Sequence, residues 1–491
     1  MKSRIGASSL SLALLVIVAA LAATAARRPR YGGALTVELA GRVTSLDPAQ
    51  PQANVEDQLA QDRLLALFAD RLVRLDGHGQ PQPSLAASWQ HDAAFKHWEF
   101  QLRADTHFQD GTLIRPDAVV SSLKVVNPGW EMSGNTNSHT IWTKPTIAIA
   151  VDLSVAIDSD TPQPDLLYVL AEPRNSILLR KSFGAVVGTG PFRISTWEPG
   201  QHAVLTANDD YWGGRPFLDS VDIQMGRVAR DRMMDLDLGK SDVVEVSPES
   251  ARLAAARGSR ISTSDPSELL AVVFMNASAG AKGARVRQAL SLAIDRASLV
   301  NVVLQKEGES AAALLPQWST GYAFLFSAPF DPATAQQLSA QISPAPALKL
   351  GYDSADALER MIAERIAVNA QAAGIAVSAQ AISSNASSAP AFDARVIRLP
   401  LASPAPGVAL ENLIGTLTVA QGTNPVFLSV ANPDDLEYLY SREREILDAY
   451  ELIPLVHLPQ VVGLSARVRD WMPLRYGEWR LADVWLDGAP Q

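Results

Sequence analysis

The side chains that most often carry chemistry are spread along this 491-residue sequence without the spacing that catalysis or metal binding needs. The chain has no cysteine, which excludes disulfides, thiol nucleophiles and thiolate metal sites. Its 7 histidines include no pair four residues apart, and no HExxH, GxSxG or phosphate-binding glycine motif occurs. A Ser-His-Asp triad assembled in space stays open, because triads are defined by geometry and not by order. We therefore expect no enzyme, no cofactor and no metal site.

Aromatic side chains in polar loops are the main candidates for contact with a bound molecule. Trp130 and Trp142 lie in polar surroundings, and Trp318 and Tyr322 lie in a glycine- and serine-containing loop that follows Pro316. A ligand site is a mostly apolar cavity with a few polar anchors, and loops can place such side chains at its mouth. Packing is the alternative interpretation of each aromatic residue, and the sequence leaves both open.

Composition limits the class of protein. The length predicts two or three domains, because a single core does not grow to this size. The formal net charge is −10 and the sequence pI is about 5.3, so no basic stripe is available to neutralise phosphates. We therefore expect no nucleic-acid partner.

The N-terminus predicts export. Residues 1–26 combine two basic residues, an apolar run from Leu10 to Ala22 and an Ala-x-Ala cleavage site at Ala23–Ala25. The apolar run is shorter than the roughly 20 residues that a spanning helix needs. An uncleaved N-terminal anchor stays open, because the basic residues 27–30 follow directly.

Hydrophobic periodicity predicts the elements that must position these side chains. Alternation in Phe192–Thr196 and Ala203–Ala207 predicts two strands joined by a turn at Glu198–Gln201. The apolar run Leu269–Asn276 predicts a longer strand that crosses between domains. Apolar positions at helical spacing predict helices at Gln58–Leu75, Arg230–Leu238, Arg285–Arg296 and Ala355–Ala373.

Several motifs resemble, in their order along the chain, those of the family 5 extracellular solute-binding proteins, the oligopeptide- and dipeptide-binding group. The two strongest of these motifs are the stretch Gly188–Gly214 (GTGPFRISTWEPGQHAVLTANDDYWGG) and the helix motif Val286–Arg296 (VRQALSLAIDR). The others include Gly32–Val37 (GGALTV), Leu46–Pro48 (LDP) and Phe108–Thr112 (FQDGT). Each motif is modest alone, and the set covers nearly the whole chain after the signal.

The resemblance implies an α/β architecture, the two-lobed periplasmic binding protein fold (class II, type C) with an inserted α+β subdomain in the first lobe. The solute would be enclosed between lobes that hinge strands connect. On this basis we place the first lobe at residues 31–60, 185–264 and 456–491, the inserted subdomain at 61–184 and the second lobe at 265–455.

One departure from the family concerns the ligand. Peptide-binding members carry an acidic residue in a W-x-A-D-x-x-DP segment of the second lobe, where it pairs with the ammonium group of the peptide. The matching segment here, Val396–Pro406, has no Asp or Glu and offers Arg398, while Asp393 and Glu411 flank it. We therefore expect an anionic, sugar-like or apolar ligand, or a degenerated site. Asn276, at the end of the predicted crossing strand, is a further candidate contact, with a strand-end cap as its alternative role.

The resemblance implies a periplasmic protein that captures a small solute, peptide-like or otherwise, and delivers it to an ABC importer. Its partners would be that solute and the permease subunits in the inner membrane, and the protein itself would be a monomer. Without a cysteine it cannot carry the lipid anchor of many such proteins. The alternative is a binding fold repurposed as a sensory or interaction subunit without transport, which the missing acid and an apparently shortened second lobe favour.

Overall fold

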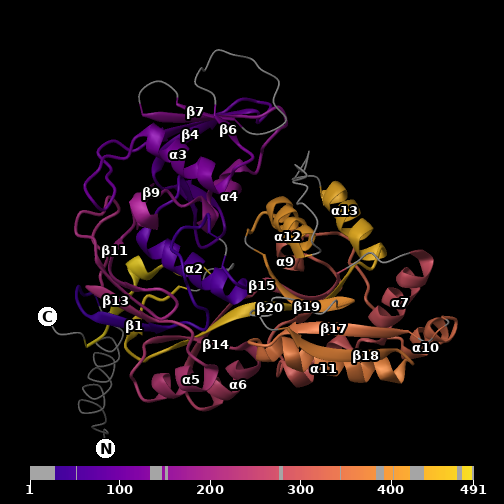
Figure 1. Ribbon diagram of the computed structural model, residues 1–491. Coiled ribbons are helices and arrows are strands. Elements are labelled where there is room, and N and C mark those ends of the chain that lie inside the picture. Colours follow the sequence, from indigo (N-terminus) through magenta and orange to yellow (C-terminus); the bar gives the residue numbers. More distant parts are fainter. Residues whose placement is uncertain are drawn as a thin grey trace, which may run out of the picture.

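The computed structural model describes residues 28–50, 52–132, 146–149, 153–275, 280–342, 344, 346–382, 392–401, 403–420, 436–472 and 478–488. The expected signal at residues 1–26 lies outside this part. Two lobes lie side by side, and the first lobe carries an extra layered body above it (Figure 1).

A mixed sheet of 11 strands runs through both lobes. Its strands in spatial order are β11 (Phe192–Glu198), β12 (His202–Ala207), β13 (Ser220–Gln224), β1 (Ala34–Glu38), β14 (Val243–Val246), β20 (Leu452–Leu464), β15 (Arg260–Phe274), β19 (Ala394–Pro400), β17 (Ala347–Asp353) and β18 (Ala376–Ile382), with β16 (Glu309–Ser310) beside β20. Strands β1, β13 and β14 pair in parallel in the first lobe, as do β17, β18 and β19 in the second. The predicted strands at 192–196 and 203–207 are confirmed as β11 and β12.

The long antiparallel strands β15 and β20 connect the two lobes. The pairing of β15 with β20 shifts register between Thr263 and Pro266 and again between Pro266 and Glu268. Proline has no N–H to donate to the ladder, and a bulged strand bends more easily than a regular one. Strand β15 is therefore irregular where it passes from one lobe to the other.

Helices cover the sheet of the second lobe on both faces (Figure 1). Side chains of β15 alternate between two cores, since Leu270 and Val272 pack with α11 and Leu269 and Ala271 pack with α12 and α13. The helices of the chain are α2 (Val55–Phe68), α3 (Pro116–Val126), α4 (Leu166–Leu170), α5 (Ala229–Asp237), α6 (Pro248–Ala256), α7 (Gly280–Ala293), α8 (Arg296–Ser298), α9 (Gln317–Thr320), α10 (Pro332–Ala340), α11 (Ala357–Ala372), α12 (Pro406–Ala420) and α13 (Leu436–Asp448). The predicted helices in the second half of the chain are confirmed as α7 and α11.

The body above the first lobe is a separate α+β layer with its own core. Its five-stranded sheet has the order β4 (Ala86–His91), β5 (His97–Leu102), β8 (Ser154–Asp158), β7 (Thr146–Ile149) and β6 (Glu131–Met132). Helices α3 and α4 pack against this core. Short hairpins complete the fold: β2 (Val73–Leu75) with β3 (Pro81–Pro83), β9 (Leu179–Arg180) with β10 (Val186–Val187), and β21 (Val468–Arg469) with β22 (Trp485–Leu486).

The helix predicted at Gln58–Leu75 is shorter than the apolar pattern indicates. Helix α2 ends at Phe68, Ala69 is extended, and Val73–Leu75 is the strand β2. The apolar residues up to Phe68 fill the first-lobe core, whereas Leu72 and Val73 enter the core of the inserted body. The run of apolar residues thus continues across two cores, and its periodicity could not show where the helix ends.

The stretch Gly188–Gly214 holds the C-terminal end of α2. A Cβ added at Gly188 would lie 1.8 Å from the backbone oxygen of Phe68, so the two backbones are in direct contact. Asp70, just beyond the helix, accepts hydrogen bonds from the Tyr211 hydroxyl and the Trp212 indole N–H, both at 2.9 Å. Burial raises the pKa of Asp70 to about 6 although both hydrogen bonds oppose the shift. This motif therefore fixes α2 and has no chemistry of its own.

Replacing Gly188 by alanine should destabilise the protein by about 3 kcal/mol, because the new methyl group meets backbone that cannot move aside. The matched control is Gly415→Ala in α12, where the added methyl group meets open space and should stabilise the helix by about 0.5–1 kcal/mol. Chemical denaturation of the three proteins measures both differences. Equal stability of the Gly188 variant and the wild type would contradict the close packing.

Candidate functional site

The two lobes meet along α2. One side of this helix, including Ala60, Leu64 and Leu65, is buried in the first-lobe core. The other side, which includes Asp62 and Arg63, remains partly exposed and turns toward the second lobe, where α2 contacts β19. The groups on this side of α2 and the second-lobe groups facing it form the candidate site.

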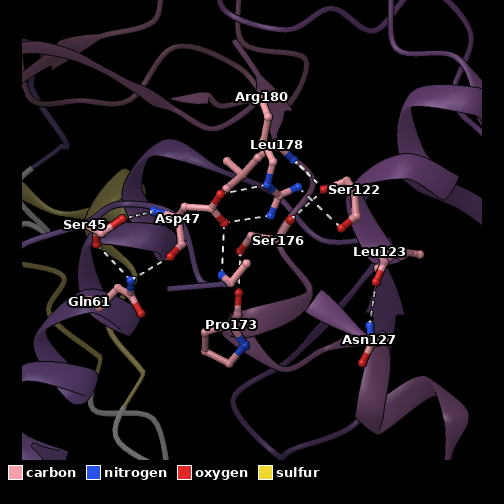
Figure 2. A network of polar contacts seen from close by, with 11 residues as sticks. Ser45, Asp47, Gln61, Ser122, Leu123, Asn127, Pro173, Ser176, Leu178 and Arg180 are labelled. Atoms are coloured by element: carbon pink, nitrogen blue, oxygen red, sulfur yellow. Dashed lines mark hydrogen bonds and ion pairs between the residues drawn. The ribbon is translucent and has the colours of Figure 1, made fainter. Parts of the chain in front are cut away.

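A polar network fixes the chain that leads into α2 (Figure 2). The Arg180 guanidinium donates to both oxygens of Asp47, at 2.8 and 2.7 Å, and the Gln61 amide donates 2.8 Å to the Ser45 carbonyl. Burial acts to raise the pKa of Asp47, but the hydrogen bonds from Arg180 and the Ala49 N–H together with the charge of Arg180 outweigh it, and the pKa is lowered. The Leu-Asp-Pro motif thus joins the first lobe to the inserted body through an ion pair. Helix α2 is therefore bonded to the chain that precedes it through Gln61 and packed against Gly188 at its C-terminal end.

Arg398 lies in the junction, on β19, and its charge is already neutralised. Its guanidinium contacts Glu268 at 2.6 Å and Asp356, the N-cap of α11, at 3.3 Å. Burial by itself lowers the pKa of Arg398, but Glu268, Asp356 and the more distant Glu56 together raise it above its ordinary range. Glu56 belongs to the first turn of α2, so this charge cluster draws on both lobes.

Arg63 is the counterpart of Arg398 on the first lobe. It forms an ion pair with Glu245 of β14, donates 3.0 Å to the Gln460 side chain of β20, and stacks 4.4 Å over the Trp479 ring. Burial lowers its pKa to about 10, although Glu268 and Glu56 act in the other direction. Arg63 therefore connects α2 to strands β14 and β20.

Asp62 is the least compensated charge at the junction. Its carboxylate accepts a 3.1 Å hydrogen bond from Gln58, one turn earlier on α2. Burial raises its pKa to about 7; Gln58, Arg71 and Arg63 oppose this shift, and Glu172 adds to it. The guanidiniums of Arg71 and Arg63 pair with Glu478 and Glu245, and their charges still act to lower the pKa of Asp62, so burial is the cause of the raised value.

The hinge strand adds an unpaired hydroxyl. Ser267 is 3% exposed, and among the described residues its Oγ has no hydrogen-bond partner. The neighbouring Pro266 carbonyl accepts the indole N–H of Trp318 at 3.0 Å. A buried polar atom without a partner is rare in native proteins and commonly marks a contact to a bound water, ion or ligand.

The six candidate residues from the sequence are not gathered into one place. Arg398 lies at the junction and Trp318 is bonded to the hinge strand. Trp130 packs against the core of the inserted body, and Tyr322 is buried between Phe326 and Tyr440 in a second-lobe core. Trp142 and Asn276 lie outside the described residues. Ligand contact by all six remains a prediction.

The acidic groups at the junction were missed because each lies in an unremarkable sequence context. Asp62 and Arg63 interrupt the apolar helix pattern as adjacent charges on α2, and this interruption was the available signal. Glu268 follows Ser267 at the start of an apolar strand, and no local feature of the sequence marks it as the partner of Arg398 130 residues later.

Two further buried carboxyls titrate in the same range as Asp62. Burial raises the pKa of Glu359 on α11 to about 7, with a further rise from Asp356. Glu443 on α13 accepts hydrogen bonds from the backbone N–H groups of Leu314 and Leu315, and burial raises its pKa to about 7. These acids are buried inside the second lobe and are structural groups.

The side chains and helices of the described residues bear on metal binding and on membrane insertion. There, no group of three or more histidine, aspartate or glutamate side chains is placed to hold a metal ion. In the same residues no helix combines the length and apolar character needed to cross a bilayer.

A family model matches residues 80–416, and its description is "Bacterial extracellular solute-binding proteins, family 5 Middle". A probable ABC transporter periplasmic-binding protein, SapA of Escherichia coli, is 26% identical over 58% of this chain and 57% of its own length. A probable D,D-dipeptide-binding periplasmic protein, DdpA of Escherichia coli, is 25% identical over 59% of this chain and 58% of its own length. The chain thus spans less than two thirds of the length of these two relatives.

Solved structures resemble the fold over almost the whole chain. NikA of Staphylococcus aureus in complex with Ni(L-His)2 has a TM-score of 0.75 at 16% identity and covers 92% of this chain and all of its own. DppA of Helicobacter pylori in complex with the peptide STSA has a TM-score of 0.76 at 18% identity, covering 93% of this chain and 99% of its own. The architecture is therefore the two-lobed periplasmic binding protein fold, and that expectation is confirmed.

Removing one partner of the buried Arg398–Glu268 pair should be costly. Arg398→Met should destabilise the protein by about 3–5 kcal/mol, because Glu268 is left charged and buried, whereas the double variant Arg398→Met with Glu268→Leu should recover most of that loss. Denaturant unfolding of the single and double variants measures the coupling. Additive losses in the double variant would show that the two side chains do not depend on each other.

The raised pKa values of Asp62, Glu359 and Glu443 predict that stability falls as pH rises from 6.5 to 8. The folded protein still binds these protons near pH 7, whereas the unfolded chain has released them, so ionisation costs folding free energy, about 2 kcal/mol for the three together. Burial lowers the pKa of His457 to about 4, so its opposite effect acts mainly between pH 4 and 6.5 and is largely complete at the lower edge of this window.

Glu443→Gln should remove about a third of this pH dependence, while Glu445→Gln, on the exposed side of the same helix, should leave it unchanged. Unfolding midpoints at several pH values measure both. A slope that Glu443→Gln does not alter would assign the effect to other groups.

Proposed function

This chain belongs to the family 5 bacterial extracellular solute-binding proteins, and from that premise we propose that it captures a small peptide-like solute between its lobes for an ABC importer. Capture is by hinge closure: groups of both lobes contact the solute, which stabilises the closed arrangement over the open one. The proposal includes a periplasmic location, permease subunits in the inner membrane as partners, a monomeric state and no catalytic step.

The observation that carries the proposal is the arrangement of charges where α2 meets the second lobe. Asp62 lies on the partly exposed side of α2, burial raises the pKa of its carboxyl, and the cations near it also have other acidic partners. Sites of this class combine an enclosed space with a few polar anchors that fix the orientation of the solute. The unpaired hydroxyl of Ser267 is a second candidate anchor.

The same arrangement bears on the kind of solute. The sequence favoured an anionic, sugar-like or apolar ligand because Arg398 stands where peptide-binding relatives carry an acid. Arg398, however, is engaged by Glu268 and Asp356, so little of its charge is left for a ligand. We infer that Asp62, on the first lobe, receives the ammonium group of a peptide-like solute. The names of relatives support this class, since they include a D,D-dipeptide-binding and a di/tripeptide-binding protein.

The lobe boundaries belong to the same proposal. The sequence places the inserted subdomain at 61–184, but α2 packs in the first-lobe core to Phe68. We therefore infer a first lobe of residues 31–68, 185–264 and 456–491, an inserted subdomain of 69–184 and a second lobe of 265–455. The hinge then falls at the bulged stretch of β15 around Pro266 and at the matching part of β20.

Asp62→Asn should weaken binding of short peptides with a free amino terminus by about 10- to 100-fold, because the amide cannot offset a buried ammonium. N-acetylated peptides should bind the wild type and the variant equally. Asp448→Asn, an exposed carboxylate on α13, is the control and should change nothing. Isothermal titration calorimetry against a di- and tripeptide library measures the affinities.

Binding of an ammonium group should also displace the proton that Asp62 holds near pH 7. Calorimetry in two buffers of different ionisation enthalpy would detect this proton release, and Asp62→Asn should abolish it. Mass spectrometry of solutes that heat releases from the purified protein identifies the natural ligand class. A protein that binds no peptide, and releases none, would contradict the proposed function.

A further inference from the structure

A direct hydrogen bond joins the inserted subdomain to the second lobe. The Asn412 side chain on α12 donates from Nδ2 to Oε1 of Glu172, at 2.7 Å. Glu172 follows α4 and is the N-cap residue of a short 3-10 helix, Pro173–Asn175. In Figure 1 the helices α4 and α12 face each other where the two bodies come together. The two residues are 240 positions apart in sequence, and each belongs to a different lobe.

One carboxylate oxygen of Glu172 is bonded within the inserted subdomain, and the other is bonded to the second lobe. Oε2 pairs with Arg174 Nε of its own segment at 2.6 Å, and Oε1 takes the hydrogen bond from Asn412. Glu172 is 4% exposed, so this bond forms largely out of water. Hydrogen bonds to a charged group are roughly twice as strong as neutral ones.

Each end of the bond is fixed to its own lobe. On one side the Arg71 guanidinium donates 2.7 Å to the Ala171 carbonyl, and the Asn175 side chain donates 2.6 Å to the Val169 carbonyl. On the other side α12 is anchored by Leu410 and Leu413, which are buried in a second-lobe core. Neither end can follow the other when the lobes separate, so opening at the hinge must break the bond.

We propose that the Glu172–Asn412 hydrogen bond is a latch, through which the chain stabilises its own closed arrangement independently of the solute. The closed arrangement is then favoured before a solute contributes any contact. Asn412 acts as a positioning residue for capture, because it sets the closed-to-open ratio through Glu172 and need not touch the solute.

The absence of cysteine makes the latch directly measurable. Ser121→Cys on α3 and Ser441→Cys on α13 place two dyes on exposed positions of opposite bodies. Single-molecule energy transfer then reports the distance between them. The protein is unfolded and refolded before labelling so that any co-purified solute is removed, and no solute is added.

Asn412→Ala should shift the population toward the open arrangement by about tenfold, the factor that corresponds to 1.4 kcal/mol. Asn412→Asp should open it further, because two carboxylates then face each other. The exchanged pair Glu172→Gln with Asn412→Asp should close it again, since the donor and acceptor are only swapped. Asn301→Ala, the same change at an exposed position of the second lobe, is the control and should behave as the wild type.

Unfolding midpoints of all variants should stay close to that of the wild type, because the bond lies between the lobes and not in a core. Dye distances that are the same in Asn412→Asp and the wild type would overturn the latch. So would an exchanged pair that stays as open as Asn412→Asp. The measurement uses no peptide, so its failure would not bear on solute capture, and failure of the peptide titrations would not bear on the latch.

Discussion

The ion pair between Glu268 and Arg398 fixes the second-lobe side of the junction where the two lobes meet. Both side chains are largely removed from water, and a buried charge without a partner costs several kcal/mol. Glu268 lies on the hinge strand and Arg398 on the neighbouring strand β19, so the pair holds the second-lobe sheet in register at the point where the hinge begins. Asp356, at the N-terminus of α11, also pairs with Arg398. Glu56, on the first lobe, acts on Arg398 through its negative charge. Any relative movement of the lobes therefore changes the electrostatic environment of this pair.

Helix α2 transmits such movement because it is held along its whole length. Its C-terminal end lies against the backbone of Gly188 and is tied by Asp70 to Tyr211 and Trp212. Its middle is pinned to the hinge strands by Arg63. A helix fixed in this way cannot adjust locally to a solute, so the second lobe must come to it. The Gly-Thr-Gly-Pro motif therefore acts on the position of α2, because Gly188 lies against the backbone of Phe68.

Much of this fold could be predicted from the sequence, but the site could not. Period-two alternation located β11 and β12, helical spacing located α11, and the ordered motifs indicated the two-lobed architecture, because each signal is local. The end of α2 was misplaced, since Leu72 and Val73 continue the apolar pattern while belonging to another core. The sequence marks Arg398 as an unusual charge, but its partners Glu268 and Asp356 are distant in sequence. Whether a charge is available to a ligand depends on such non-local partners, and composition cannot reveal them.

The balance of charge around α2 decides what the junction can accept. Acidic and basic side chains of both lobes lie close together there, among them Glu56 and Asp62 of α2 and Arg398 of β19. Taking a carboxylate out of water is unfavourable, and such a group binds a proton instead. The raised pKa of both Glu56 and Asp62 is caused mainly by burial, while the charges of Arg398 at Glu56 and of Arg71 at Asp62 oppose it. A proton held for this reason can be replaced by any cation that reaches the carboxyl and stays. In the proposed capture of a peptide-like solute, its ammonium group would take the place of that proton at Asp62.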